Sequence, residues 1–314
     1  MLPHRYAIGL AFGVFLLLVV GGTVNPTGSS LACPEPTFVC HGELFPPMVG
    51  GVFYEHGHRL LAETIGLAQI GLTILLFRRR RDLRLLAILL LVLVCVQGFL
   101  GAVTVYYKLP WYVSTLHLLT GMSYFATLIY TAFRTRPAPS VMELERHDRL
   151  VQKLGTARTW ILIAMGSVFC QLLLGALVRH LGAALVCLGM PTCTLGGDWW
   201  PDASVQDLHM IHRGFGCVVG IVTTIAAVQV WRHARAWPAL RKLALLAPIL
   251  VLAQITLGVA VVLTWRAVPV AVGHFAGAAA LWGLWVTAFL MTRTRTRMRP
   301  ALEVEPMLPR AVAV

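Results

Sequence analysis

The stretch "RLLAILLLVLVCVQGFLGAVTVY" (84–106) decides the fold class. After Arg84 it has no charged side chain, and its length matches the roughly 20 apolar residues that an α-helix needs to cross a hydrocarbon core about 30 Å thick. Seven other runs share this character, so the sequence predicts spans at about 6–24, 58–77, 84–106, 112–133, 160–180, 207–231, 240–263 and 268–291. Because lipid offers the backbone no hydrogen-bond partners, we predict an all-α integral membrane protein with eight transmembrane helices.

Composition supports a membrane protein and argues against nucleic-acid binding. Of the 314 residues, 58% are hydrophobic and only 12% are charged, yet the net charge is +13. The basic residues follow the topology, because 21 of the 26 lie in the termini and in the even-numbered connections. The other five are Arg59, Lys108, Arg179, Arg213 and Arg266. The positive-inside rule therefore predicts that both termini are cytoplasmic.

The chain repeats itself. The stretch "GGTVNPTGSSLAC" (21–33) aligns with "GALVRHLGAALVC" (175–187), and the same offset of 154 residues carries the His-Arg pair at 58–59 onto that at 212–213. Further along, 96–118 aligns with 253–275, and both copies place a glutamine and a histidine 20 residues apart. Three matched patches in the same order indicate a duplicated unit.

We therefore expect two tandem four-helix bundles related by pseudo-twofold symmetry. The predicted divisions are an N-terminal half at 1–135, a cytoplasmic linker at 136–158, a C-terminal half at 159–292 and a basic cytoplasmic tail at 293–314.

Four histidines lie near the outer ends of the even-numbered spans, as the pairs His58 with His117 and His212 with His274. A single histidine in a span is more often packed or hydrogen-bonded than ligating, but four at matched depths in two copies favour a functional site. Neutral imidazole can bind a metal, and two histidines on facing helices can hold a haem iron. The absence of acidic and cysteine side chains beside the histidines at this depth favours haem over zinc or an iron–sulfur cluster. The sequence predicts one haem site in each half.

Residues beside these histidines differ between the halves. Glu55 lies three residues before His58, on the same helix face if the helix extends that far, whereas His209 occupies the equivalent position. Glu55 is a candidate catalytic group, or an acid at a helix N-terminus. Arg59 and Arg213 could bind haem propionates or anchor their helices at the lipid headgroups.

The cysteines also follow the repeat. Cys33 and Cys40 lie in the first outer loop, and Cys187 and Cys193 lie in its copy. Paired cysteines in outer loops indicate an oxidising compartment and predict two loop disulfides. Either a structural or an electron-exchanging role fits such pairs.

The "ExxHR" motif at 55–59, the "HR" at 212–213, the histidines at 117 and 274 and the twin outer loops resemble the haem A synthase family (CtaA-type) over about residues 6–291. The resemblance implies an oxidoreductase that converts the C8 methyl group of haem O to a formyl group. The product, haem A, would serve cytochrome oxidase.

The resemblance also implies roles for single residues. His212 and His274 would be the axial ligands of a resident haem b, His58 and His117 would flank the substrate haem O, and Glu55 would be catalytic. The remaining implied features are a Cys33–Cys40 disulfide linked to activity and a structural Cys187–Cys193 disulfide.

The family further implies a cell (inner) membrane location, with the cysteine loops on the outer, periplasmic side. Candidate partners are haem O synthase (a farnesyltransferase), cytochrome oxidase assembly proteins and a second copy of the chain. Two other functions are consistent with the histidines: a dihaem b-type cytochrome that exchanges electrons with quinone, and a non-catalytic haem-binding assembly factor. The cytochrome would need neither Glu55 nor the loop cysteines.

Overall fold

The computed structural model describes residues 1–201 and 203–293, and these are largely helical. The helices are α1 (Leu2–Val24), α2 (Gly50–Arg79), η1 (Arg81–Leu83), α3 (Arg84–Tyr106), α4 (Trp111–Arg134), α5 (Val141–Gln152), α6 (Thr156–His180), η2 (Ala183–Leu185), α7 (Ser204–His233), α8 (Pro238–Leu263) and α9 (Val268–Met291). Eight of the described helices are long and apolar enough to cross a membrane, and they confirm the eight predicted spans. The protein is therefore a multi-pass membrane protein.

One helix boundary matters for the site. The apolar run predicted a span from 58, but α2 begins at Gly50. Its first two turns carry Glu55 and His56, whose side chains are buried. Glu55 and His58 therefore belong to one helix, as the motif required.

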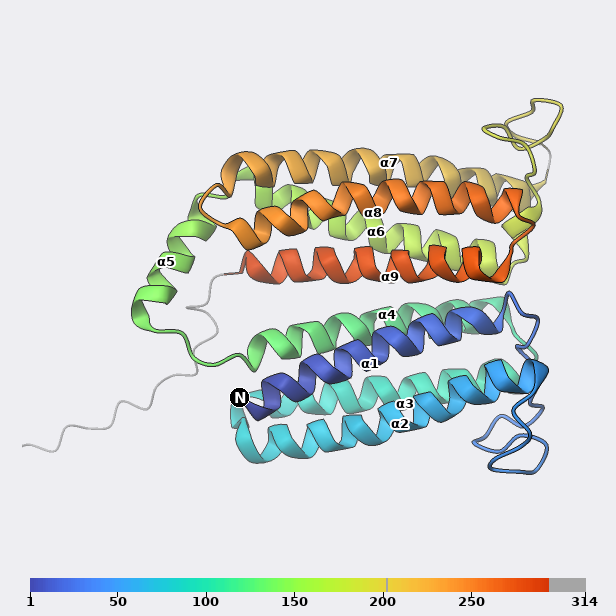
Figure 1. Ribbon diagram of the computed structural model, residues 1–314, viewed down its shortest axis with the longest axis horizontal. Coiled ribbons are helices and arrows are strands. Elements are labelled where there is room, and N and C mark those ends of the chain that lie inside the picture. Colours follow the sequence, from blue (N-terminus) through green and yellow to red (C-terminus); the bar gives the residue numbers. More distant parts are fainter. Residues whose placement is uncertain (202, 294–314) are drawn as a thin grey trace, which may run out of the picture.

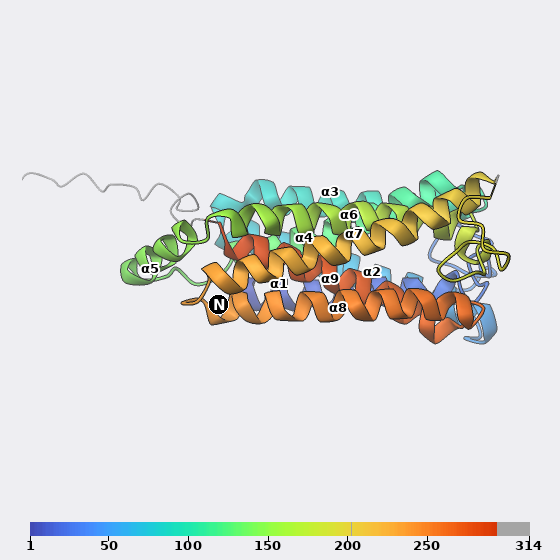
Figure 2. The same ribbon diagram turned by 90° about the horizontal axis from the view of Figure 1, so that it is seen from above.

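Helices α1–α4 pack against one another in sequence order, and so do α6–α9. Figure 1 shows these two groups side by side, with the long loops at one end and α5 at the other. The turned view in Figure 2 shows the same elongated arrangement. The pseudo-twofold relation, the domain divisions and the cytoplasmic placement of the termini stay predictions. The predicted tail at 293–314 lies outside the described residues beyond Arg293.

The two groups meet through α1 and α4 on one side and α6 and α9 on the other. In the middle of this contact, the indole N–H of Trp282 donates to the backbone carbonyl of Met122 at 3.0 Å. Near the loop end, the Arg179 guanidinium lies 3.4 Å from the carbonyl oxygens of Gly21 and Gly22. Side chains of the second helix group thus donate hydrogen bonds to backbone carbonyls of the first, both in the middle of the contact and near its loop end.

The predicted linker holds a helix that the sequence analysis did not predict. At the start of α5, Glu143 N–H donates to the Ser140 hydroxyl at 3.2 Å, and Ser140 N–H donates to the Glu143 carboxylate at 2.8 Å. This reciprocal pair is a capping box, which satisfies backbone donors at a helix start. Leu144 and Val151 are its buried side chains.

The outward faces of the spans are apolar, as helices that contact lipid require. Leu85, Phe99 and Leu252 are exposed there. The three unpaired cysteines, Cys95, Cys170 and Cys217, are exposed too.

Candidate functional site

Each of the four histidines packs its ring edge against a glycine of a neighbouring helix. The pairs are His58 with Gly21, His117 with Gly101, His212 with Gly175 and His274 with Gly258. A Cβ atom added at these glycines would lie 2.8, 3.5, 3.2 and 3.3 Å, respectively, from the Cε1 atom of the ring. At Gly21, Gly175 and Gly258 the absent side chain makes room for the imidazole, whereas a Cβ atom at Gly101 would make an ordinary contact. The glycines occupy matching places in the aligned stretches, which is the signal that could have identified them.

In the second half, the histidines share a cavity. His212 on α7 and His274 on α9 both line it, and its volume is about 790 Å³. Ligand pockets typically measure about 300–1,000 Å³, so the cavity is large enough for a cofactor. In the first half, His58 on α2 and His117 on α4 belong to the same group of four packed helices, and each ring lies against a glycine of the adjacent helix. The structure thus places the members of each predicted pair within one helix group.

The donor set fits a haem iron. Among the described residues, the Nδ1 atoms of His58, His117 and His274 are buried without a hydrogen-bond partner. Haem iron takes neutral imidazole ligands, and paired histidines on separate helices are a common arrangement for it. Ligation by these four histidines stays a prediction, now supported by their pairing and by the glycine cradles.

Glu55 lies at the centre of a polar network that joins α2 to the first loop. Its side chain is buried, with a relative exposure of 4% for the residue. One carboxylate oxygen accepts a hydrogen bond from Cys33 N–H at 3.0 Å, and the other pairs with Arg59 one turn along the helix. Carboxylate–guanidinium pairs of this kind fix both partners. The position of the candidate catalytic group is therefore tied to the disulfide loop.

Arg59 and Arg213 perform the same structural task in the two halves. The Arg59 guanidinium donates to the carbonyl oxygens of Cys33, Glu35 and Thr37 at 3.0, 2.6 and 2.8 Å. The Arg213 guanidinium donates to those of Cys187, Gly189 and Thr192 at 2.7, 2.8 and 3.1 Å. Sequence reasoning did not predict this clamp, because backbone carbonyls have no sequence signature. Propionate binding by either arginine stays a prediction.

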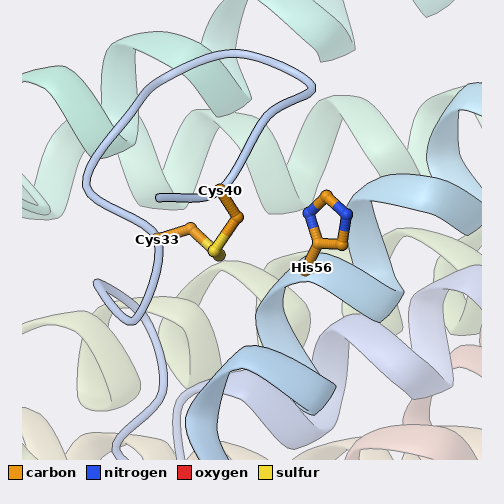
Figure 3. Close-up of side chains that lie close together, drawn as sticks. All are labelled: Cys33, Cys40 and His56. Carbon is orange, nitrogen blue, oxygen red and sulfur yellow. A yellow bond between two sulfur atoms is a disulfide. The ribbon is translucent and has the colours of Figure 1, made fainter. Parts of the chain in front are cut away.

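Both predicted disulfides, Cys33–Cys40 and Cys187–Cys193, are present. His56 lies beside the first, and its ring faces the sulfur atoms (Figure 3). One ligand atom from each of Cys33, Cys40 and His56 falls within 4.8 Å of the others. Metals bind thiolates rather than disulfides, so the closed bridge makes this a packed contact and not a metal centre.

The second half has different neighbours around its disulfide. Met210 occupies the position equivalent to His56 and packs against Cys187 and Cys193. His209, at the position of Glu55, is buried and lines the cavity. The two halves therefore share histidines, arginines and disulfides, but the second half has His209 at the position of Glu55.

Comparisons with known proteins identify the family of this chain. A family model for cytochrome oxidase assembly proteins (COX15-CtaA) matches residues 48–286. The chain is 29% identical over 270 residues to "Heme A synthase" of Shouchella clausii, covering 84% of this chain and 87% of the relative. It is 28% identical over 305 residues to "Heme A synthase" of Geobacillus kaustophilus, covering 94% and 92%.

The matched region includes Glu55 and all four paired histidines, and it extends over well more than half of the chain. The protein therefore belongs to the COX15-CtaA family of cytochrome oxidase assembly proteins, and its resemblance to the haem A synthases is confirmed.

Proposed function

We propose that this protein is a haem A synthase, an enzyme that oxidises the C8 methyl group of haem O to a formyl group. The observation that carries the proposal is the buried Glu55 carboxylate beside the first histidine pair, where the second half has His209. The names of the relatives agree with haem A formation and give no support to a dihaem cytochrome that serves quinone.

The two halves would hold two different porphyrins. His212 and His274 would be the axial ligands of a resident haem b in the cavity that they line. His58 and His117 would hold haem O with its reacting edge toward Glu55. When bound, haem b supplies one-electron redox chemistry, while the protein supplies position and electrostatics.

Glu55 would handle the protons or the charge of the reaction. Conversion of a methyl group to a formyl group removes protons and electrons from the carbon and adds oxygen. A fixed carboxylate can accept such a proton or stabilise positive charge that develops on the substrate. Because Arg59 and Cys33 N–H hold both carboxylate oxygens, the group is oriented before the substrate binds.

This function implies a setting. The spans would lie in the cell (inner) membrane, with both disulfide loops on the outer, periplasmic side. A farnesyltransferase that makes haem O would supply the substrate, and cytochrome oxidase assembly proteins would receive haem A.

Replacement of Glu55 tests the proposal. Glu55→Gln keeps the size of the side chain but removes its charge, so the purified variant should retain wild-type haem content and fail to convert haem O. Glu63→Gln, an exposed acid two turns along the same helix, is the matched control and should convert haem O normally. The measurement is chromatography of extracted pigments from cells that also express a haem O synthase. Haem A production by Glu55→Gln at the wild-type rate would show that Glu55 is not catalytic.

A further inference from the structure

One buried nitrogen in the first half has no task in the proposed reaction. His56 lies in the first turns of α2, and its relative exposure is 0%. Its Nε2 atom donates to the backbone carbonyl of Leu44 at 2.9 Å, because a carbonyl oxygen can only accept. The neutral ring therefore carries its proton on Nε2 and a free lone pair on Nδ1. That Nδ1 atom is buried without a hydrogen-bond partner among the described residues.

The His56 ring faces the sulfur atoms of Cys33 and Cys40 (Figure 3), and one ligand atom from each of the three residues lies within 4.8 Å of the others. A histidine that binds a metal usually donates its other ring N–H to a carboxylate or a backbone carbonyl, which fixes the ring and leaves the binding nitrogen bare. The bond to Leu44 gives His56 this arrangement. A metal site here lacks only free thiolates.

Reduction would supply the thiolates. The closed bridge binds no metal ion, because thiolates and not disulfides are metal ligands. A dithiol reductant opens such a bridge by exchange: the S–S bond breaks, the two cysteines gain two electrons and two protons, and the reductant becomes a disulfide. Each cysteine thiol then releases its proton as it binds the metal ion.

The ligand set and the dryness of the site determine which ion fits. Thiolates favour Cu(I) and Zn(II), but Zn(II) takes four ligands in most protein sites. This cluster offers three ligand atoms, and Cys33, Cys40 and His56 each have 0% exposure, so water has no access as a fourth ligand. Cu(I) is stable with three ligands. Bonds of about 2.3 Å to sulfur and 2.0 Å to nitrogen place trigonal ligand atoms about 4 Å apart, so the freed side chains need to close by less than about 1 Å.

We propose that Cys33, Cys40 and His56 form a trigonal Cu(I) site when the first disulfide is reduced. The site shares no ligand with the four paired histidines, so the proposal stands apart from the proposed haem chemistry. The second loop has Met210 beside its disulfide, so the nitrogen ligand is a property of the first loop.

Competition for Cu(I) tests the site in the purified full-length protein. The protein is reduced with a water-soluble phosphine, freed of reductant without oxygen and titrated with Cu(I) against a chromophoric chelator. The reduced wild type should hold one Cu(I) ion more than His56→Asn. The affinity of the site should fall more than about 100-fold in this variant, because even the loss of an outer partner of a metal ligand costs about 10–100-fold. The oxidised wild type should leave the copper with the chelator.

His41→Asn is the matched control. His41 directly follows Cys40 in the same loop, but it is exposed and lies outside the three-residue cluster. Asparagine tolerates the positive φ of 53° at this position. This variant should bind Cu(I) as the wild type does.

X-ray absorption at the copper edge identifies the ligands. Cys187→Ser combined with Cys193→Ser leaves the first pair as the loop thiols, and the copper should then have two sulfur neighbours and one nitrogen neighbour. Equal copper retention by the wild type and His56→Asn would overturn the proposal, as would a copper shell without nitrogen or an equal loss in His41→Asn. If the double serine variant does not fold, the competition in the otherwise wild-type protein decides alone.

Discussion

Gly21→Ala changes one methyl group at the contact between α1 and the His58 ring. The added Cβ atom would lie 2.8 Å from His58 Cε1 and 3.1 Å from Nδ1. Carbon atoms in contact prefer separations of about 3.5–4.0 Å. The ring must therefore move by about 0.7 Å or more, the difference between the lower limit of that range and 2.8 Å.

This displacement sets the expected loss of activity. A misplacement of about 1 Å in a positioning residue can cost about 100-fold in rate, so we expect Gly21→Ala to convert haem O about 10–100-fold more slowly. The variant should still fold, because the preference of a helix for alanine over glycine, about 1 kcal/mol, offsets part of the cost of the steric overlap. The variant should thus be folded and slow.

Gly101→Ala is the matched control in the same half. Its Cβ atom would lie 3.5 Å from His117 Cε1, which is an ordinary contact, so conversion should stay near wild type. The assay is the ratio of haem A to haem O in extracted pigments at equal protein, with thermal unfolding in detergent to compare stability. The reasoning is refuted if folded Gly21→Ala works at the wild-type rate, or if Gly101→Ala is impaired to the same degree.

Three further predictions concern the outer loops. Arg59→Lys should speed reduction of the first disulfide by a water-soluble phosphine, because one ammonium cannot reach all the carbonyl oxygens that the guanidinium binds. Arg213→Lys should speed reduction of the second disulfide for the same reason. Thiol labelling with mass spectrometry measures both rates, and unchanged rates would contradict the role of the two arginines in holding the loops. The Glu35 carboxyl accepts hydrogen bonds from its own and two other loop N–H groups, which lower its pKa below the usual 4.5, so this stabilisation is present above that pH and is lost as the pH falls through the lowered pKa. As the pH falls through the lowered pKa of Glu35, phosphine reduction of the first disulfide should accelerate in the wild type but not in Glu35→Gln. Equal acceleration in both proteins would exclude Glu35 as the cause. His56→Met, which copies Met210, should lower the free energy of unfolding by no more than about 1 kcal/mol. The hydrogen bond between the His56 ring and a loop carbonyl is lost, but so is a buried ring nitrogen that has no partner. Equilibrium unfolding in detergent measures the change, and a much larger loss would contradict the comparison with Met210.

The spans were predictable because the bilayer imposes a length and a composition on every helix that crosses it. The start of α2 was not, since Glu55 and His56 interrupt the apolar run although they lie inside the helix. Helix α5 was missed for the opposite reason: its surface is charged, and only the Ser140–Glu143 spacing indicated that it begins there.

The histidine pairs were predictable because duplication exposed them as a pattern, and the same comparison singled out Glu55. The contacts that orient these groups were not predictable. Arg59 binds backbone oxygens, which every residue possesses, and the bond between Gln171 and His212 joins residues 41 positions apart on separate helices. Such contacts depend on how the helices pack, which residue spacing along one helix does not determine.

The bonds between the two helix groups also bear on electron flow. Trp282 joins the groups in the middle of their contact, and Arg179 joins them near the loops. Two attachments at different levels resist both pivoting and sliding, so the gap between the histidine pairs should stay constant as the loops move. Electron tunnelling between two porphyrins depends steeply on that gap. The rate of electron transfer between the two porphyrins would then be set by the packing between the two helix groups, and movement of one group against the other would not control it.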